Sequence, residues 1–280
     1  MNLNMQKTIL ITGSTDGIGK ETAFHLAVRG YRVLIHSRDP EKLERTISEV
    51  KKQSGNSNIT GYVADLSSLL EVREMAVALL DLENKLDVLL NNAGVIMKSY
   101  QLSDEGLEMT FSVNHLSHFY LSGLLLPLLL KNGKAKIINL SSMVHSRSID
   151  FDKLLDPVFF DSVNAYSLSK LCNVLFTYKL SDILRDTGIT VNCMHPGVIN
   201  TKMLMETWGP IGSPVKEGAE REVFLVESEI TEMFTGKYFQ DDREHKTCTV
   251  SYDKTIQNTL WNLSLSLLER AGFRAGYPTT

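Results

Sequence analysis

The chain has 280 residues, 43% of them hydrophobic, which allows one large core and fits a single α/β domain spanning residues 1–280. Its formal net charge is −4 and its acidic and basic residues are interspersed, which argues against nucleic acid as a partner. Its three cysteines lie far apart, which argues against a disulfide framework and favours a reducing compartment.

Short β-branched runs alternate with longer amphipathic stretches along the chain. The runs predict buried strands at residues 7–12, 31–36, 58–64, 86–92, 135–141 and 189–195. The amphipathic stretches predict helices at residues 17–30, 39–55, 66–84, 106–130, 165–188 and 253–272. This alternation predicts the α/β fold class, a doubly wound parallel sheet of the Rossmann type with helices on both faces.

The chain opens almost on its first strand, without the apolar core of a signal peptide. The densest apolar run, residues 121–130, is about half as long as a membrane span and contains Pro127. We therefore expect a buried helix there, no integral membrane segment and a cytoplasmic location. His115 and His118 are close enough to share a helix face, but no further ligands accompany them, so no metal is expected.

Residues 196–218 form the one long stretch without a clear helix or strand pattern. Long loops inside a compact domain are usually functional or disordered. Because this stretch contains Met, Leu and Trp, we expect a small substrate lid at residues 199–218 rather than disorder.

A glycine-rich turn follows the first predicted strand and opens the first predicted helix. Gly13, Gly17 and Gly19 have the spacing GxxxGxG. Glycines allow a tight turn and a close approach of the backbone to a pyrophosphate at the positive end of a helix. The position of the turn predicts a dinucleotide site, although such glycines can also form a turn without a ligand.

The residues after the second predicted strand indicate which dinucleotide binds. An NAD-specific site usually has an acidic residue here that holds the ribose 2′-hydroxyl. This chain has Ser37 in that place, followed by Arg38, whose forked guanidinium suits a 2′-phosphate. We therefore expect NADP(H) to be preferred and NAD(H) to be possible, the alternative being that Arg38 is a solvated surface residue. Asp39 is expected to cap the helix that starts at Pro40.

Tyr166 and Lys170 lie four residues apart in a predicted helix and therefore on one face of it. Many such pairs are partly solvated surface contacts. A nearby cation also favours the phenolate, which brings the phenol closer to proton transfer near neutral pH. The pair is therefore either a surface contact or an acid–base pair.

Several motifs follow one another in order: TGSTDGIG, NNAG, VNHLSHF, INLSS, YSLSK and HPGVINT. Together they resemble the short-chain dehydrogenase/reductase family over nearly the whole chain. The segment between Ser142 and Tyr166 is longer than in much of the family and is similar to that of the retinol dehydrogenase-like branch, as are SRDPEK, HPGVINT and GKYFQD. Members of that branch often have a membrane-anchoring N-terminus, whereas this chain opens almost on its first predicted strand. The resemblance therefore implies a retinol dehydrogenase-like protein but not retinol itself as the substrate.

The resemblance implies a catalytic set of Asn114, Ser142, Tyr166 and Lys170. Tyr166 would be the acid/base, and Lys170 would lower its pKa and bind the nicotinamide ribose. Ser142 would hold the substrate oxygen, although Ser141 could face the site instead, because neighbours on a strand point oppositely. Asn114 would support a water-linked proton relay to Lys170, or would satisfy a local carbonyl.

The resemblance also implies the cofactor contacts. Asp65 would contact the adenine, Asn92 and its neighbours would line the floor of the site, and the segment after the sixth strand would form a turn beside the nicotinamide. Asn91 is expected to hold the sheet together. The expected cofactor-binding residues are Gly13, Ser14, Thr15, Gly17, Ile18, Gly19, Ser37, Arg38, Asp65, Leu66, Asn92, Ala93, Gly94, Tyr166, Lys170, Pro196, Gly197, Val198 and Thr201.

These roles imply that the protein interconverts a carbonyl compound and its alcohol by hydride transfer, with Tyr166 as the acid/base. Apolar residues of the lid and the long segment could form the pocket of a small hydrophobic aldehyde, ketone or secondary alcohol, or could be plain packing: Phe159, Phe160, Met203, Leu204, Met205 and Trp208. The family also implies a homodimer or homotetramer formed through long helices such as the one that carries Tyr166. Two alternatives are a catalytically silent nucleotide-binding regulatory protein and an NAD-retaining epimerase or dehydratase.

Overall fold

One sheet forms the centre of the protein in this computed structural model, which describes residues 6–131 and 133–278. Within that part of the chain its strands are β1 (Thr8–Ile11), β2 (Arg32–Ser37), β3 (Ile59–Val63), β4 (Val88–Asn91), β5 (Ala135–Leu140), β6 (Ile189–His195), β7 (Tyr238–Gln240) and β8 (Arg243–His245). The strand order is β3-β2-β1-β4-β5-β6-β7-β8, and neighbours are parallel except for the antiparallel pair of β7 and β8. The strand order reverses between β1 and β4, and ligands of such sheets bind in the crevice at that switch point.

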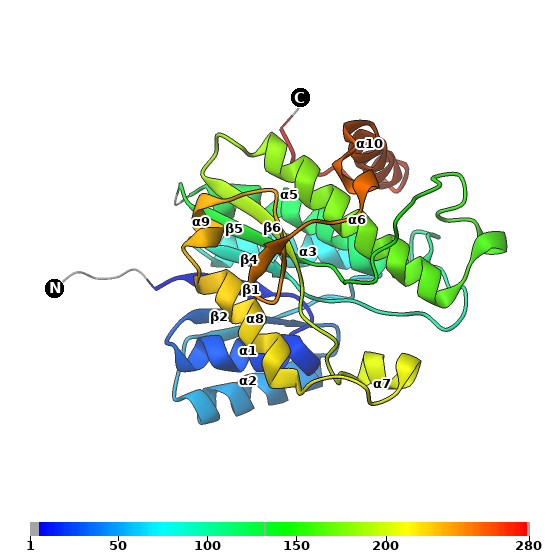
Figure 1. The fold of residues 1–280 in the computed structure, drawn as a ribbon. Helices are drawn as coiled ribbons and strands as arrows, with labels where there is room; N and C mark the ends of the chain where they lie inside the picture. The colour runs from blue at the N-terminus through cyan, green and yellow to red at the C-terminus, as the bar shows by residue number, and fades with distance from the viewer. Residues whose placement is uncertain (1–5, 132, 279–280) are drawn as a thin grey trace.

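Helices cover both faces of the sheet (Figure 1), as the α/β prediction requires. One face carries α1 (Gly17–Val28), α2 (Pro40–Ser54) and α8 (Val215–Glu227), whose apolar residues share a core cluster with the strands. The opposite face carries α3 (Leu69–Leu82), α5 (Ser117–Leu130) and α6 (Ser162–Ile183), with α10 (Lys254–Arg270) packed outside α6. The shorter helices are α4 (Met109–Phe111), α7 (Lys202–Trp208), α9 (Ile230–Met233), and the 3₁₀ turns Pro157–Phe159 and Thr249–Tyr252.

Local sequence signals set the ends of α2 as predicted. The Asp39 carboxylate accepts a hydrogen bond from the Lys42 N–H at 3.0 Å, and Pro40 follows it in the first helical turn. At the other end Gly55 adopts a left-handed conformation with φ of 71°, which costs glycine no steric strain. The helix therefore begins directly after β2 and holds the loop that carries Arg38.

The predicted helix at residues 106–130 is present but begins at Met109 and contains a π-helical turn, Ser112–Leu116. Glu108 sets its start, because the carboxylate accepts hydrogen bonds from the Thr110 and Phe111 N–H groups. π-turns inside α-helices often mark functional positions, and this one carries Asn114.

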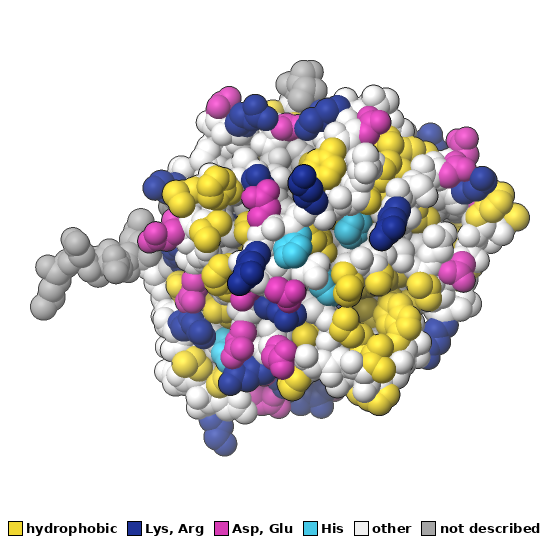
Figure 2. Space-filling view, in the orientation of Figure 1, with side chains coloured by type: hydrophobic (Ala, Val, Ile, Leu, Met, Phe, Trp, Pro, Cys, Tyr) yellow, Lys and Arg dark blue, Asp and Glu magenta, His cyan; other side chains and the backbone are white. Residues whose placement is uncertain are grey.

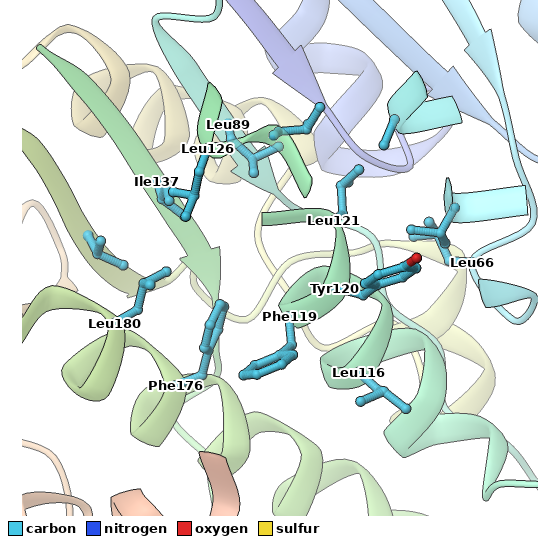
Figure 3. Packing of buried hydrophobic residues seen from close by; sticks show 14 of the residues in the cluster. Leu66, Leu89, Leu116, Phe119, Tyr120, Leu121, Leu126, Ile137, Phe176 and Leu180 are labelled. Atoms are coloured by element: carbon cyan, nitrogen blue, oxygen red, sulfur yellow. The ribbon is translucent and has the colours of Figure 1, made fainter. Parts of the chain in front are cut away.

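The stretch Met109–Leu130 is the one helix among the described residues whose length and composition would suit a membrane span. Its apolar window is 83% buried inside the protein, however, as is usual for the core helix of a globular domain. Figure 3 shows Phe119 of this helix pointing toward Phe176 of α6, and their ring centroids are 5.3 Å apart. The prediction of a buried helix at residues 121–130 is therefore confirmed.

The C-terminal third contains elements that the sequence pattern did not predict. Strands β7 and β8 have three residues each, too few for an alternating pattern. Helix α8 is charged in its first half, and its large buried apolar residues gather in its last two turns. The segment 196–218, expected to be irregular, contains helix α7, and its last residues already belong to α8.

Candidate active site

A cavity of about 1000 Å³ lies at the carboxyl ends of the parallel strands. Every residue predicted to bind the cofactor lines it except Ser14, and so do three of the predicted catalytic residues, Ser142, Tyr166 and Lys170. Ser14 is fully buried behind the wall, where its hydroxyl donates to the Ile11 carbonyl and accepts from the His36 N–H. It therefore fastens the end of β1 to β2.

The glycine turn packs so tightly that side chains are excluded from it. A Cβ on Gly19 would lie 2.4 Å from the Asn92 amide nitrogen, and a Cβ on Gly13 would lie 3.0 Å from the Ala93 backbone. Gly13 and Gly17 also have positive φ angles of 64° and 51°. The turn leads into α1, whose first N–H groups have no helical acceptor and whose positive end suits a phosphate. These features fit the pyrophosphate of a dinucleotide.

His36 and Asn92 hold this turn in place. The His36 Nδ1 accepts from the Gly13 N–H at 2.9 Å, so its proton lies on Nε2, which donates to the Ala64 carbonyl at 3.0 Å. Burial lowers the pKa of His36 to about 4, which keeps it neutral. The Asn92 amide donates to the Thr12 and Gly13 carbonyls. His36 stands directly before Ser37 at the end of a strand, but its role was missed, because nothing in the local sequence shows its contact with the turn.

Polar side chains gather at the end of the cavity beside β2. The Arg38 side chain is 73% exposed, and its guanidinium lies 4.0 Å from the Asp65 carboxylate. The Ser37 hydroxyl accepts hydrogen bonds from the Asp39 N–H and the Thr15 hydroxyl. Arg38 is therefore free to turn toward a ligand, whereas the Asp39 carboxylate is used in capping α2.

Lys42 is a second cation at this end of the cavity that the sequence did not single out. Its ammonium pairs with the Asp16 carboxylate at 2.6 Å, and both residues line the cavity. Arg38 and Lys42 are therefore the two cations at this end, and each lies beside a carboxylate, that of Asp65 or that of Asp16.

Ser142, Tyr166 and Lys170 meet in the middle of the cavity. The pKa of Tyr166 is raised to about 12, because the effect of burial outweighs that of the hydrogen bond with the Ser142 hydroxyl, which lowers the pKa. The Lys170 ammonium lies 5.5 Å from the centre of the Tyr166 ring and donates to the Leu140 carbonyl at 3.1 Å. Burial lowers the pKa of Lys170 to about 8. The neighbouring Ser141 donates to the Lys170 carbonyl, so its hydroxyl is engaged away from Tyr166.

Asn114 lies behind the cavity wall and is fully buried. Its side-chain oxygen accepts from the Val95 N–H at 2.7 Å, and its amide donates to the Val95 carbonyl and to the Ser169 hydroxyl. It therefore does satisfy a local carbonyl. Its oxygen also lies 3.4 Å from the position that a Cβ on Gly94 would occupy, as does the Lys170 ammonium. Asn114 and Lys170 thus face the same glycine, and the relay between them stays a prediction.

The lid segment lies across the far end of the cavity. The Thr201 hydroxyl caps α7 by accepting from the Leu204 N–H, and the Trp208 ring centre lies 6.3 Å from that of Tyr166. Glu206 on the outer side of α7 lies 3.6 Å from Lys98 in the loop after β4. Figure 2 shows hydrophobic side chains gathered on the surface around α7.

The structure divides the residues expected to form the substrate pocket. Met203, Leu204 and Trp208 line the main cavity, whereas Met205 on the same helix is 47% exposed. Phe159 and Phe160 line a separate cavity of about 260 Å³, because the long segment folds against the outer side of the N-terminal part of α6. Five residues that were missed also line the main cavity. Met97 and Gln101 follow β4, Met143 and Val144 follow β5, and Ile211 follows α7.

Among the described residues, no three His, Cys, Asp or Glu side chains are placed to hold a metal ion. His115 and His118, the closest pair in the sequence, are both buried and have separate partners. The His115 Nε2 pairs with the Ser264 hydroxyl, and the His118 Nε2 pairs with the Thr12 hydroxyl. Burial lowers the pKa of each to about 3.

Known proteins are similar to this chain in both sequence and fold. A model of the short chain dehydrogenase family matches residues 7–210. The chain belongs to the short-chain dehydrogenase/reductase family. Retinol dehydrogenase 12 of Mus musculus is 39% identical over 94% of this chain and 86% of its own length, and retinol dehydrogenase 13 of Homo sapiens is 35% identical over 94% and 84%. These relatives place the chain in the retinol dehydrogenase-like branch.

Solved structures superpose on the chain. An uncharacterized protein from Mycobacterium Paratuberculosis has a TM-score of 0.80 and 28% identity, over 98% of this chain and 96% of its own. A variant of the actinorhodin polyketide ketoreductase with NADPH has a TM-score of 0.69 and 27% identity, over 85% and 97%. A 3-ketoacyl-(acyl-carrier-protein) reductase from Brucella melitensis complexed with NADH has a TM-score of 0.66 and 25% identity, over 83% and 95%. A nicotinamide dinucleotide is therefore the cofactor class of the family, and these structures include both forms.

Proposed function

We propose that this protein is an NADP(H)-dependent oxidoreductase that interconverts a hydrophobic aldehyde or ketone and its alcohol. The observation that carries this proposal is the meeting of Ser142, Tyr166 and Lys170 in one cavity that also holds the glycine turn. The relatives named retinol dehydrogenases support chemistry between an alcohol and a carbonyl group. They do not favour a silent regulatory protein or an epimerase. The free cysteines support a reducing compartment, and we propose the cytoplasm.

The residues of the site can stabilise a developing oxyanion. A bound nicotinamide dinucleotide supplies the hydride. The Tyr166 hydroxyl donates its proton to the substrate oxygen while the Ser142 hydroxyl donates a hydrogen bond to it. Both interactions strengthen as negative charge grows on that oxygen, so they favour the transition state over the ground state. In this proposal Lys170 supports proton return to Tyr166, and Asn114 orders the relay.

The cavity has apolar walls that support a hydrophobic substrate. Met97, Met143, Leu204 and Trp208 line it, and Trp208 lies against Tyr166 itself. Apolar walls with a few converging polar groups are typical of small-molecule sites. The lid segment would cover the substrate and exclude water from the proton transfer.

The preference for NADP(H) rests on Arg38 and Lys42, which line the cavity beside Ser37. A charge-assisted hydrogen bond to a 2′-phosphate contributes about 1.5–3 kcal/mol, or roughly 10- to 150-fold in affinity. We expect wild type to bind NADPH at least tenfold more tightly than NADH when cofactor fluorescence is titrated. Arg38→Ala should remove most of that difference.

The matched control is Arg45→Ala, which removes an exposed cation of α2 that does not line the cavity. It should leave the preference unchanged. Equal binding of NADH and NADPH by wild type would overturn the cofactor assignment. The reaction itself is tested by following NADPH oxidation with a panel of apolar aldehydes and ketones. Wild type should turn over at least one of them, and Tyr166→Phe should be slower by about 10² or more.

A further inference from the structure

Arg221 of α8 lies against the back of the Pro196–Gly197 turn, which follows β6. Its Nη1 donates a hydrogen bond to the Pro196 carbonyl at 2.8 Å. Gly197 has a φ of 103°, and a Cβ on it would lie only 1.8 Å from the same Nη1. The guanidinium thus fills the space that a side chain on Gly197 would need. The arginine and the glycine therefore fit one another closely.

The turn has two sides with different surroundings. Pro196, Gly197 and Val198 line the cavity that holds Tyr166, whereas Arg221 does not line it. Arg221 therefore touches neither a ligand in the cavity nor the reacting atoms. Any influence it has on them must pass through the backbone of the turn.

A carboxylate from the tip of the β7–β8 hairpin holds the other side of Arg221. Its Nη2 lies 3.0 Å from the Asp241 Oδ1. Asp241 and Asp242 are the only non-glycine residues with positive φ among those the structure describes, at 49° and 59°. Two-residue hairpin turns of type I′ require positive φ at both central residues, and Asp is among the residues that adopt it. Here it belongs to the two-residue turn that brings Asp241 to Arg221.

A buried group beside the turn lacks a partner. His195 directly precedes Pro196, lines the cavity and is 6% exposed, and its Nδ1 has no hydrogen-bond partner among the described residues. Buried polar atoms without a partner are rare, and each calls for an explanation such as a catalytic role or a bound water or ion. The cavity side of the turn therefore carries a polar atom that a ligand could pair with.

We propose that Arg221, held by Asp241, is a positioning residue that fixes the Pro196–Gly197 turn against the nicotinamide end of the bound dinucleotide. The proposal rests on the proposed function, since it needs a dinucleotide in the cavity. Arg221 and Asp241 both lie beyond residues 7–210, which the family model matches. This Arg221–Asp241 clamp therefore comes from the C-terminal part of the chain. Loss of the clamp should weaken contacts at the nicotinamide end and leave the end beside Arg38 intact.

The test compares NADPH with 2′,5′-ADP, which lacks the nicotinamide half, in calorimetric titrations of the full chain. Arg221→Met should weaken NADPH binding about tenfold and lower kcat with a substrate from the carbonyl panel, while 2′,5′-ADP binds as in wild type. Asp241→Asn keeps a residue suited to the hairpin turn and should show the same split more weakly. Arg221→Lys retains one hydrogen bond to the Pro196 carbonyl and should recover part of the affinity.

The control is Arg29→Met, which breaks the 3.3 Å contact of Arg29 with Glu227 on the same helix α8. It should leave both ligands and kcat unchanged. The proposal is overturned if Arg221→Met and Asp241→Asn bind NADPH as wild type does, or if NADPH and 2′,5′-ADP weaken equally, which would indicate a general loss of structure. If wild type binds neither NADPH nor NADH, the proposed function fails and the clamp has no ligand to position. These failures are distinct.

Discussion

Tyr166 and Lys170 stand on one face of α6, and burial moves their pKa values in opposite directions. It raises the pKa of Tyr166 to about 12 and lowers that of Lys170 to about 8. Between pH 6 and about 8 the phenol therefore holds its proton while the ammonium holds its charge. This is the protonation state that the reduction of a carbonyl group requires, because Tyr166 must donate.

The pH dependence of reduction should follow Lys170. Because its folded pKa lies at about 8, Lys170 loses its charge above that pH, and we expect kcat to fall by up to tenfold per pH unit there. The measurement is kcat at saturating NADPH between pH 6 and 10. Lys170→Arg keeps its charge throughout and should show a lower kcat without this fall. A wild-type kcat that stays level to pH 10 would contradict the assignment.

Spacing along one helix and the ordered family motifs predicted much of the site, whereas contacts that neither of them records were missed. One helix carries both Tyr166 and Lys170, so a spacing of four fixed their geometry in advance. His36 holds the Gly13 N–H across 23 residues, and no spacing rule connects the two. Met143 and Ile211 reach the cavity from loops, whose paths depend on the finished fold.

Helices α1 and α8 pack together over a buried carboxyl group. Glu222 is fully buried, and its Oε2 accepts from the Thr22 hydroxyl at 2.7 Å. The pKa of Glu222 is raised to about 8, because the effect of burial outweighs that of the hydrogen bond from Thr22, which lowers the pKa. The carboxyl group is therefore protonated in the folded protein at neutral pH but ionised in the unfolded chain.

This difference predicts how stability changes with pH. The folded state binds the proton more tightly, so ionisation of the unfolded chain lowers the free energy of unfolding as pH rises from about 4.5 to about 8. The contribution is on the order of a few kcal/mol. Glu222→Gln cannot ionise, so its gain in Tm over wild type should grow across this window and level off above it. The exposed Glu220→Gln on the same helix should show no such trend. A gain that shrinks with rising pH would contradict the sign.

At the scale of elements, each predicted strand is present, and all but the edge strand β3 bury their apolar runs almost completely within the parallel sheet. Such runs contrast with amphipathic helices on either side, which makes them easy to recognise. Strand β7 gave no such signal, because its three residues are too few to form a recognisable apolar run. It is held in the sheet by pairing with β6, more than 40 residues earlier in the chain. Helix α8 escaped prediction because it buries Glu222 at a position where a pattern search expects an apolar residue.

At the scale of the molecule, the outer face of α6 is already occupied by the chain's own α10. The Trp261 ring lies 4.9 Å from that of Phe119 and 6.3 Å from that of Phe176. The Ser264 hydroxyl pairs with His115 at 3.0 Å. A homodimer or homotetramer stays a prediction, but a second copy must then meet another surface or displace α10.

The cavity joins the two sides of the switch point, so a ligand in it should stabilise the whole fold. Gly13 and Arg38 line it from the β1–β2 side of the switch point, and Ser142 and Pro196 line it from the β5–β6 side. A ligand at 100 times its Kd stabilises the folded state by about 2.7 kcal/mol. With an unfolding entropy of about 2.1 cal/mol/K per residue, a chain of this length should gain about 5 °C in Tm. NADPH should reach this shift at a lower concentration than NADH when both are titrated in thermal melts.

Arg38→Ala separates this linkage from general solvent effects. Its Tm without ligand should match wild type, because Arg38 is largely exposed and makes only a 4.0 Å contact with Asp65. Its NADPH curve should move to where the NADH curve lies. Because only a ligand that binds the folded state can raise Tm, a wild-type Tm indifferent to millimolar NADPH and NADH would mean that the cavity holds neither. The glycine turn, held by His36 and Asn92, would then serve only to join β1 to α1.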